Sequence, residues 1–562
     1  MTQQFKAKAC APGIGLGPVS VLPELFSPEN QNLTISKDEV QSELDRFQEA
    51  LNEAQNETEE VQRHTDNRLY EQLSQLFSMQ KMILEDPLFV NEVEQRIREE
   101  RKNAEGAVIE ALEQIHSAFS DQFSDDATRG RMLDVLDVGW RVLRHLNTKL
   151  LTPGLPHRGI LVARNLSPGI AVRLEETEVD GLITSGSHPG SHVSIVAQAM
   201  NIPAVSVSED GFFDEIEPGD QIVVSANQGR VIVSPTESQL DDFSEARDRL
   251  DRFNRQTRDR ARSIDNEELP CAIRGNIGLS SEVSLLKDQG GHGAGLIRTE
   301  LLFMGDDSNY PSRERQLAVY QQLAEAVSPY TATFRTFDFG GDKERLVHPK
   351  QPRRSRGRGI HRSLKNSERF QAQLKALLEA CRQYQNIKIL IPMVGGPEEI
   401  HAVREHIEAL SDELNVEPPP LGVMVEIPSI VYMLDDVTES VDFLTVGTND
   451  LTHYLMGTDR FEEGDVDVVE APAPALFRCL GEIFQKANHT SSPVGVCGEL
   501  AGNPVFSPVL LGMGVQELSM APIRIPEVKL VTKKLTEEQC KEASSKILSF
   551  DQRKDLKRWV RK

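Results

Sequence analysis

Residues 421–428 read LGVMVEIP and residues 443–450 read FLTVGTND, and in both a short apolar run ends in polar side chains. Six more runs of this kind occur between residues 271 and 521: CAIRGNI, AGLIRTE, TATFRTFD, IKILIPMV, PVGVCGE and ELSMA. Helical stretches separate most of them, which is the alternation expected of parallel strands with crossover helices. Eight such units within about 250 to 300 residues predict a closed (β/α)8 barrel.

Polar residues of this region gather at the carboxyl ends of the apolar runs. They are Arg298, Glu300, Arg335, Asp338, Glu426, Asn449, Asp450, Cys497 and Glu499. In a barrel of parallel strands these positions meet at one end, which is the end that carries catalytic residues. The sequence therefore predicts a site at the mouth of the barrel.

The charges at this mouth indicate an anionic substrate. Up to five cations would surround it: Arg298, Arg335, Lys343, Arg358 and Arg460. Guanidinium groups bind planar or bidentate oxyanions, while Mg²⁺ prefers one or two protein carboxylates together with substrate oxygens. A small phosphate ester with Mg²⁺ on Glu426 and Asp450 fits this set. The alternative is a group of ordinary salt bridges at the barrel rim, although such pairing need not concentrate cations at one end.

The first half of the chain has a different pattern. Gly and Pro interrupt residues 1–30, and the capping sequence at 36–39 then opens a helical region. The apolar seam of its first helix is Val40, Leu44, Phe47, Leu51 and Ala54. Short strands follow, in RGILVARNLSP, GLITSGS, IPAVSV, QIVVSA and RVIVSP. A charged stretch without turn residues, 237–265, predicts a solvated helix that links two halves.

One histidine in this half is a candidate nucleophile. In SHPGSHVSIVAQAMNIP, residues 187–203, His192 directly precedes a helix-forming stretch. Free backbone N–H groups and the helix dipole at that end favour a neutral imidazole and would stabilise a phosphate bound to it. His188 lies in the preceding turn and is the weaker candidate. Most of the thirteen histidines are expected to be solvated or structural.

Composition narrows the class of protein. The 562 residues include 62 basic and 87 acidic side chains, a net charge of −25, which argues against nucleic-acid binding. The six cysteines form no Cys-x-x-Cys pair, which indicates reduced thiols and a cytoplasmic location. No signal peptide or membrane span is expected.

Several motifs together resemble one known family, enzyme I of the bacterial phosphotransferase system, the phosphoenolpyruvate–protein phosphotransferases. They are APGIGLGPV, MILEDPLF, GSHVSIVAQAMNIPAV, GAGLIRTELLFM, RTFDFGGDKE, GVMVEIPS, VGTNDLTHY, TDR and GVCGELAGNP. These motifs span nearly the whole chain in order, so the resemblance is specific.

The resemblance implies a multidomain α/β protein and a role for each region. It predicts a swivelling phosphohistidine domain at 1–30 and 150–236, an inserted all-helical domain at 31–149 that binds a histidine phosphocarrier protein, a linker helix at 237–265, and a phosphoenolpyruvate-binding TIM-type barrel at 266–562. It also implies a homodimer through the barrel, and no nucleic-acid or membrane partner is expected.

The resemblance also assigns the candidate residues. His192 would carry the phosphoryl group and Cys497 would protonate the enolate of pyruvate. The substrate-binding set would be Arg298, Arg335, Lys343, Arg358, Asn449, Asp450 and Arg460. Glu426 and Asp450 would hold Mg²⁺.

Departures from the family pattern lie near the candidate nucleophile and in the helical region. The family usually has a Gly-Gly pair and a Thr where this chain has Ser187, His188 and Gly190. Gln198 replaces a common arginine, and Gln80 replaces a frequent histidine. These changes concern the rate of transfer and the identity of the carrier, which serves either sugar uptake or a regulatory branch.

Two other functions compete with this one. Pyruvate-phosphate dikinases and phosphoenolpyruvate synthases share the two modules, but no nucleotide-binding domain is expected ahead of them here. A catalytically silent docking scaffold is the other alternative. The joint presence of His192, Glu426, Asp450 and Cys497 argues against it.

Overall fold

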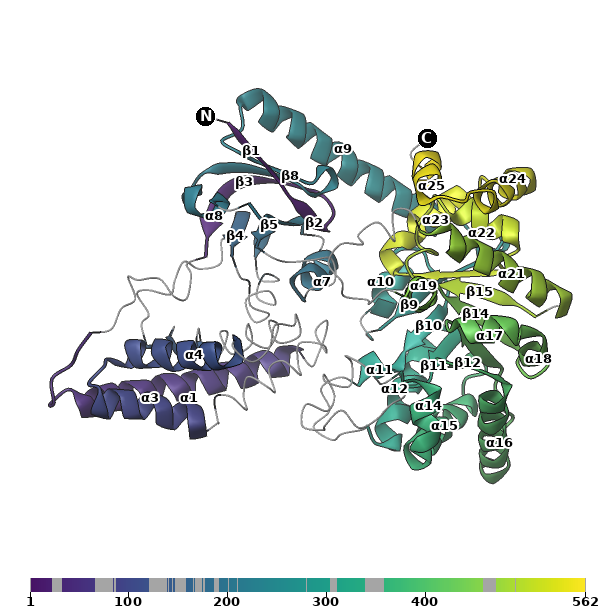
Figure 1. The fold of residues 1–562 in the computed structure, drawn as a ribbon, viewed down its shortest axis with the longest axis horizontal. Helices are drawn as coiled ribbons and strands as arrows, with labels where there is room; N and C mark the ends of the chain where they lie inside the picture. The colour runs from purple at the N-terminus through teal and green to yellow at the C-terminus, as the bar shows by residue number, and fades with distance from the viewer. Residues whose placement is uncertain are drawn as a thin grey trace. The chain divides into compact units, whose positions relative to one another are not determined.

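Figure 1 shows the computed structural model of the chain. It describes residues 2–22, 33–65, 84, 87–120, 139, 141–143, 145, 146, 158–164, 166, 174, 177–185, 192–200, 202–209, 211–278, 280, 282–303, 311–338, 358–457, 472–490 and 492–560. The chain divides into two compact units, Met1–Phe253 and Asn254–Lys562.

Among the described residues, the helical part of the first unit has three long helices: α1 (Val40–Thr65), α3 (Pro87–Glu99) and α4 (Ala104–Ser120) (Figure 1). The predicted seam of α1 is confirmed, since Phe47 and Ala54 are fully buried and pack in one cluster with Val93 of α3 and Val108 of α4. The predicted start of this helix also holds: the backbone N–H of residue 36 donates to the carboxylate of residue 39 (2.8 Å), directly before α1.

The other part of the first unit is a mixed eight-stranded sheet in the order β1-β8-β7-β3-β4-β5-β6-β2. Its strands are β1 (Gln3–Lys6), β2 (Lys8–Ala11), β3 (Ile14–Val21), β4 (Arg158–Ala163), β5 (Glu178–Thr184), β6 (Ala204–Ser206), β7 (Gln221–Ser225) and β8 (Arg230–Val233). The helices α7 (His192–Ala199) and α8 (Phe212–Glu215) and the 3₁₀ turn η3 (Ala226–Gln228) accompany them. The Gly/Pro-punctuated N-terminus thus supplies three strands. The β3–β4–β5–β6 core of the sheet is parallel.

The charged stretch predicted to be a linker helix is helix α9 (Glu237–Arg262). The division between the two units falls inside it, after Phe253. Its carboxyl end belongs to the second unit and is held there by an ion pair between Arg262 and Asp288 (2.7 Å). A 3₁₀ turn, η4 (Asn266–Glu268), follows.

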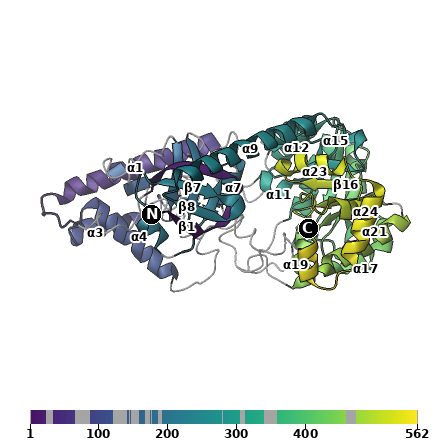
Figure 2. The same cartoon turned by 90° about the horizontal axis from the view of Figure 1, so that it is seen from above.

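All eight apolar runs of the second half form strands, and these close into a parallel barrel in the order β9 to β16 (Figures 1 and 2). The strands are β9 (Ala272–Ile277), β10 (Ala294–Arg298), β11 (Ala332–Arg335), β12 (Ile387–Ile391), β13 (Leu421–Val425), β14 (Phe443–Gly447), β15 (Val494–Cys497) and β16 (Glu517–Met520). The barrel closes because β16 pairs with β9. The predicted (β/α)8 barrel is confirmed.

Helices follow every strand of the barrel. They are α10 (Glu282–Asp288), α11 (Thr299–Leu302), α12 (Arg313–Val327), α14 (Ile360–Lys365), α15 (Ser367–Cys381), α16 (Pro397–Leu414), α17 (Pro428–Tyr432), α18 (Leu434–Thr438), α19 (Thr448–Met456), α21 (Pro474–Thr490), α22 (Ser507–Met513), η5 (Pro522–Arg524), α23 (Ile525–Thr532), α24 (Glu537–Leu548) and α25 (Arg553–Val560). Their local sequences explain their limits: α16 begins with Pro397, whose fixed φ suits the first helical position, and ends at Asn415, which has a left-handed φ of 51°.

Apolar side chains fill the space between the barrel strands and the surrounding helices, and also part of the barrel interior. Phe334, Leu377 and Leu480 are fully buried between strands and helices, and burial of each such side chain stabilises the fold by about 1.5–3 kcal/mol. Inside the barrel, a smaller apolar cluster includes Met424 and Cys497. In the part of the chain that the structure describes, no helix has the length and apolar character needed to cross a membrane.

Candidate active site

The strand ends of the barrel carry most of the predicted site residues. Arg298, Arg335 and Cys497 are the last residues of β10, β11 and β15, and Glu426 directly follows β13. Asn449 and Asp450 stand in the first turn of α19, directly after β14. Because neighbouring strands are in parallel register, these ends meet at the same end of the barrel.

Other predicted residues fall outside the part of the chain that the structure describes. Lys343 and Arg460 are two of them, together with Gln80, Ser187, His188 and Gly190. For His192 and Gln198 only the backbone is described. His192 is the first residue of α7, so the prediction that it stands at a helix N-terminus is confirmed.

Arg335 lies at the centre of the charged cluster. Only 4% of it is exposed, and its guanidinium pairs with Glu300 and with Asp338 (3.3 Å). Burial alone would lower the pKa of Arg335, but the Glu300, Asp338 and Glu426 carboxylates outweigh burial and raise it. Arg335 is therefore a permanent buried cation at the barrel mouth, held by carboxylates.

Arg358 extends this cluster toward α19. It donates to both oxygens of Asp338 (3.0 and 2.8 Å) and to both oxygens of Asp450 (2.9 and 3.2 Å). Such fork-shaped pairing fixes both the direction and the position of a guanidinium group. The alternative prediction, that these cations form salt bridges, is therefore correct for Arg335 and Arg358. These salt bridges are nevertheless concentrated at one end of the barrel. The joining role of Asp338 was missed, and its only signal was its place at a strand end in RTFDFGGD.

Glu426 has the surroundings of a metal ligand. It is 1% exposed, and its Oε1 accepts a hydrogen bond from the backbone N–H of Met393 (2.8 Å). Met393 adopts an uncommon positive φ of 58° at this point. The other carboxylate oxygen, Oε2, is buried and has no hydrogen-bond partner among the described residues. Burial raises the pKa of Glu426 to about 8, although the Arg335 guanidinium opposes the rise.

A cation bound at this carboxylate would need oxygens from outside the protein. The described residues hold no group of three or more His, Cys, Asp or Glu side chains that could bind a metal ion. A buried carboxylate oxygen without a partner nevertheless fits a hard divalent cation, because Mg²⁺ commonly takes one or two carboxylates and completes its shell with water and substrate. Glu426 and Asp450 fit that donor set.

Cys497 is a buried thiol at the same mouth. It is 3% exposed and donates to the backbone carbonyl of Val446 (3.4 Å). Burial raises the pKa of Cys497 to about 12, and the Glu426 carboxylate adds to the rise. The side chain is therefore a protonated thiol at neutral pH, able to donate a proton but poorly suited to act as a nucleophile.

Arg298 and Asn449 complete the described set. Arg298 makes no ion pair with any described residue, and its Nε is buried without a hydrogen-bond partner there. Asn449 accepts a hydrogen bond from the backbone N–H of Glu499 (3.2 Å). A half-buried guanidinium that has no carboxylate partner among the described residues, beside two that are paired, can bind an anionic ligand.

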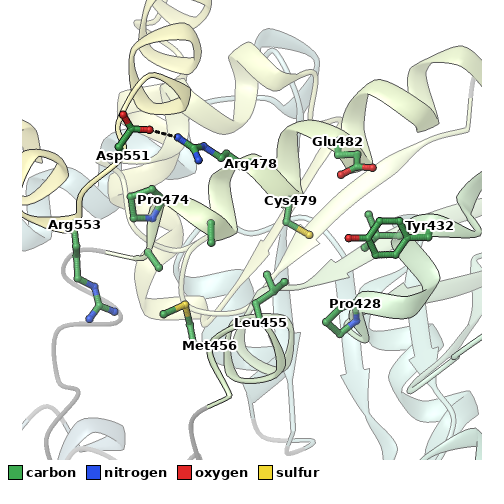
Figure 3. A pocket seen from close by; sticks show the side chains of 13 residues that line it. Pro428, Tyr432, Leu455, Met456, Pro474, Arg478, Cys479, Glu482, Asp551 and Arg553 are labelled. Atoms are coloured by element: carbon green, nitrogen blue, oxygen red, sulfur yellow. Dashed lines mark hydrogen bonds and ion pairs between the residues drawn. The ribbon is translucent and has the colours of Figure 1, made fainter.

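A separate pocket of about 580 Å³ lies on the outside of the barrel, among α17, α19, α21 and the start of α25 (Figure 3). Tyr432, Met456 and Cys479 line it, and Arg478 pairs with Asp551 (2.5 Å) at its edge. None of the predicted site residues belongs to its lining. The pocket is therefore distinct from the barrel mouth.

Family models match three segments of the chain. The model described as PEP-utilising enzyme, PEP-binding domain, matches residues 253–537. The N-terminal domain of PEP-utilising enzymes matches residues 6–131, and their mobile domain matches residues 155–229. The three segments cover both units of the structure.

Individual relatives agree with these models. The phosphoenolpyruvate-protein phosphotransferase of Staphylococcus carnosus is 30% identical over 98% of this chain and 97% of its own length. That of Priestia megaterium is 30% identical over 100% of this chain and 99% of its own. A solution structure of Enzyme I (nEIt) covers 44% of this chain and 99% of its own at 25% identity, with a TM-score of 0.34.

Proposed function

This chain belongs to the phosphoenolpyruvate-protein phosphotransferases, among the PEP-utilising enzymes, and on that premise we propose that His192 relays the phosphoryl group of phosphoenolpyruvate to a histidine phosphocarrier protein. The protein is an enzyme of phosphoenolpyruvate-dependent phosphotransfer in the phosphotransferase system, and pyruvate is the other product. The dikinase and scaffold alternatives are not favoured, because near-full-length relatives carry the phosphotransferase name.

The observation that carries the proposal is the meeting of Arg335, Arg358, Glu426 and Cys497 at one end of the barrel. Phosphoryl transfer through a loose transition state depends mainly on positioning and on neutralising charge. Arg298, which has no carboxylate partner among the described residues, is available to bind the phosphate directly. Lys343, Arg460 and Asn449 are proposed to bind the same substrate.

The barrel also contains an acid for the second half of the chemistry. Breaking the P–O bond of phosphoenolpyruvate leaves the enolate of pyruvate, which becomes pyruvate when its methylene carbon takes up a proton. The Cys497 thiol is buried, protonated at neutral pH and placed at the strand end, so we assign it as the proton donor.

His192 is proposed as the nucleophile because of its place at the start of α7. The positive end of the helix dipole disfavours the imidazolium, so the ring stays neutral and nucleophilic. The same end would stabilise the phosphoryl group once it is attached. Phosphohistidine then passes its group to the carrier, for which the helical part, α1, α3 and α4, is the proposed binding domain.

Mg²⁺ is proposed as the cofactor, with Glu426 and Asp450 as its protein ligands. The buried Oε2 of Glu426 supports the assignment. Mg²⁺ bound there would neutralise negative charge on the substrate oxygens. In the described structure Asp450 instead pairs with Arg358 (2.9 Å), so the guanidinium provides the compensating charge there.

Labelling with radioactive phosphoenolpyruvate tests the relay. His192→Ala should abolish labelling of both the protein and its carrier, because the imidazole is the only covalent relay proposed. His188→Ala is the matched control and should still be labelled. The reverse pattern would assign the relay to His188. If both variants were labelled equally, neither histidine could be the covalent relay.

We further propose that the protein forms a homodimer through the barrel. Exposed apolar side chains around the outer pocket support a protein contact there, since Tyr432 is 74% and Met456 42% exposed (Figure 3). Light scattering coupled to gel filtration should give twice the chain mass for the wild type and a smaller mass for Tyr432→Glu. An unchanged dimer in that variant would place the interface elsewhere.

A further inference from the structure

We propose that Gln373, on helix α15, is a positioning residue that sets the relative placement of Arg298 and Arg335 at the barrel mouth. The inference rests on the proposed function, because it concerns the binding of phosphoenolpyruvate by these two arginines. Among the described residues, the Gln373 side chain makes no hydrogen bond with either guanidinium, and it acts through the backbone that carries them.

The inner part of the hydrogen-bond network joins two strand ends to α15. The hydroxyl of Thr299, the residue after Arg298, donates to the backbone carbonyl of Arg335 (2.7 Å). Gln373 Nε2 donates to that same hydroxyl (3.1 Å), while its Oε1 accepts from the backbone N–H of Phe337 (3.1 Å). One amide thus holds the end of β10 and both sides of the end of β11.

The outer part of the network joins the Gln373 amide to helix α12. Gln373 Nε2 also donates to the hydroxyl of Tyr320 (3.1 Å), which donates to Gln316 Oε1 (3.1 Å). Gln316 Nε2 is the last donor of this series of hydrogen bonds, and it donates to the backbone carbonyl of Pro311 (2.9 Å). Both α12 and α15 therefore support the position of Gln373.

The direction of every bond follows from its backbone ends. The N–H of Phe337 can only donate, so the Gln373 atom facing it is the oxygen. The carbonyl of Arg335 can only accept, so the Thr299 hydroxyl donates there and must accept from the Gln373 nitrogen. The amide has a single orientation that satisfies all of its partners.

Burial raises the free-energy cost of breaking any hydrogen bond in this network. Gln373, Gln316, Tyr320 and Thr299 are each 0% exposed. A buried backbone donor left without its acceptor costs about 1–3 kcal/mol, and water does not reach such a site freely. If the Gln373 amide is removed, the Phe337 N–H loses its acceptor. The backbone at the end of β11 is then expected to shift so that this N–H can find another acceptor.

Such a shift would move the substrate-binding groups. Arg335 is two residues before Phe337, and its own carbonyl is held by Thr299. Asp338, which pairs with both Arg335 and Arg358, directly follows Phe337. A displacement of the backbone at this point is therefore passed to the guanidinium groups, and a misplacement of about 1 Å can cost about a hundredfold in rate.

Two substitutions test the proposal in the full-length protein. Gln373→Met removes the amide at similar size, and Thr299→Val removes the bridging hydroxyl at similar shape. Each should lower kcat/KM for phosphoenolpyruvate by about ten- to a hundredfold. The loss in the double variant should be smaller than the product of the two single losses, because both residues belong to one hydrogen-bond network at the end of β11.

Two readouts separate positioning from a general loss of structure. Transfer from phosphorylated carrier back to the protein does not use the barrel site, so it should be unchanged in both variants. Tyr320→Phe is the matched control: it removes the outer bond and lowers the melting temperature, yet it should keep kcat/KM within about twofold of the wild type. An equal loss in Tyr320→Phe would overturn the proposal.

A third variant separates this inference from the proposed function. Arg298→Ala should be unable to use phosphoenolpyruvate. If Arg298→Ala turns over at the wild-type rate, the proposed site itself is wrong. If Arg298→Ala is inactive while Gln373→Met and Thr299→Val both keep the wild-type kcat/KM, only the positioning role of Gln373 is overturned.

Discussion

Replacing Cys497 by alanine should separate the two chemical halves of the reaction. The thiol is 3% exposed and lies at the end of β15, so its loss removes about 1 kcal/mol of packing and leaves the fold intact. Its loss also removes the proposed proton donor. The variant should therefore fold normally but form pyruvate slowly.

The size of the effect follows from general acid catalysis. A positioned acid contributes about 10²- to 10⁴-fold, which corresponds to about 3 to 5 kcal/mol of the barrier. The pKa sets the pH range over which the acid is available. Burial raises the pKa of Cys497 to about 12, so about one thiol in ten thousand is ionised at pH 8, against about a quarter for an ordinary cysteine.

This shift gives the pH dependence a definite sign. Since the pKa is raised, the proton-bearing form dominates at all pH values below about 12, and the acid is lost only as the pH rises toward that value. Pyruvate formation should therefore show no alkaline limb from Cys497 between about pH 6 and 10. A limb near pH 8.5 that disappears in Cys497→Ala would contradict the described burial.

The assay compares pyruvate release with phosphoryl transfer. Pyruvate is measured by coupling to lactate dehydrogenase, and transfer from phosphorylated protein to carrier is measured by loss of label. Cys497→Ala should slow the first and leave the second unchanged. The matched control is Cys271→Ala, since Cys271 is also buried with a pKa of about 12 but precedes β9 at the opposite end of the barrel. Equal losses in both half-reactions would refute the proton-donor role.

Three further predictions concern the metal, the domains and stability. In a His192→Ala background with phosphoenolpyruvate present, Glu426→Gln and Asp450→Asn should each weaken Mn²⁺ binding, measured by electron paramagnetic resonance, by about tenfold or more; unchanged affinity in either would remove that ligand. A fragment ending at residue 262 should fold, exchange label with phosphorylated carrier and take none from phosphoenolpyruvate, whereas direct labelling would contradict the division of labour. Burial lowers the pKa of Lys529 to about 8, so the unfolded chain binds more protons than the folded one between about pH 8 and 10.5. The free energy of unfolding should therefore rise with pH across that range, by at most about 3 kcal/mol, as the penalty for burying the charged amine is relieved. Urea unfolding of Lys529→Met should lack that rise, and a parallel pH profile would refute the assignment.

Several features of the fold could be predicted because their causes are local. The eight barrel strands are short apolar runs with turn and helix signals between them, and all eight occur as expected. The buried seam of α1 and the helical character of α9 follow from side-chain spacing and from charge without turn residues. The place of His192 at the start of α7 could also be predicted, from the Pro-Gly pair that precedes it in the sequence.

Other features depend on residues that are distant in sequence. Arg358 and Asp450 are 92 residues apart, and nothing in either motif indicates that they pair. Asp338 was recognised only as a strand-end residue, yet it joins two arginines. The amide of Gln373 was not recognised at all, because a buried glutamine in a helix resembles any polar residue of that helix.

The pattern along the chain was enough to establish the barrel, the family and the group of residues at its mouth, because apolar periodicity and the parallel order of strands bring the strand ends together whatever the details of packing. Folding decided which of those charges neutralise one another, which carboxylate oxygen is left without a partner, and which buried thiol stays protonated. These properties depend on distance and on desolvation, and both arise only when segments about a hundred residues apart are packed away from water.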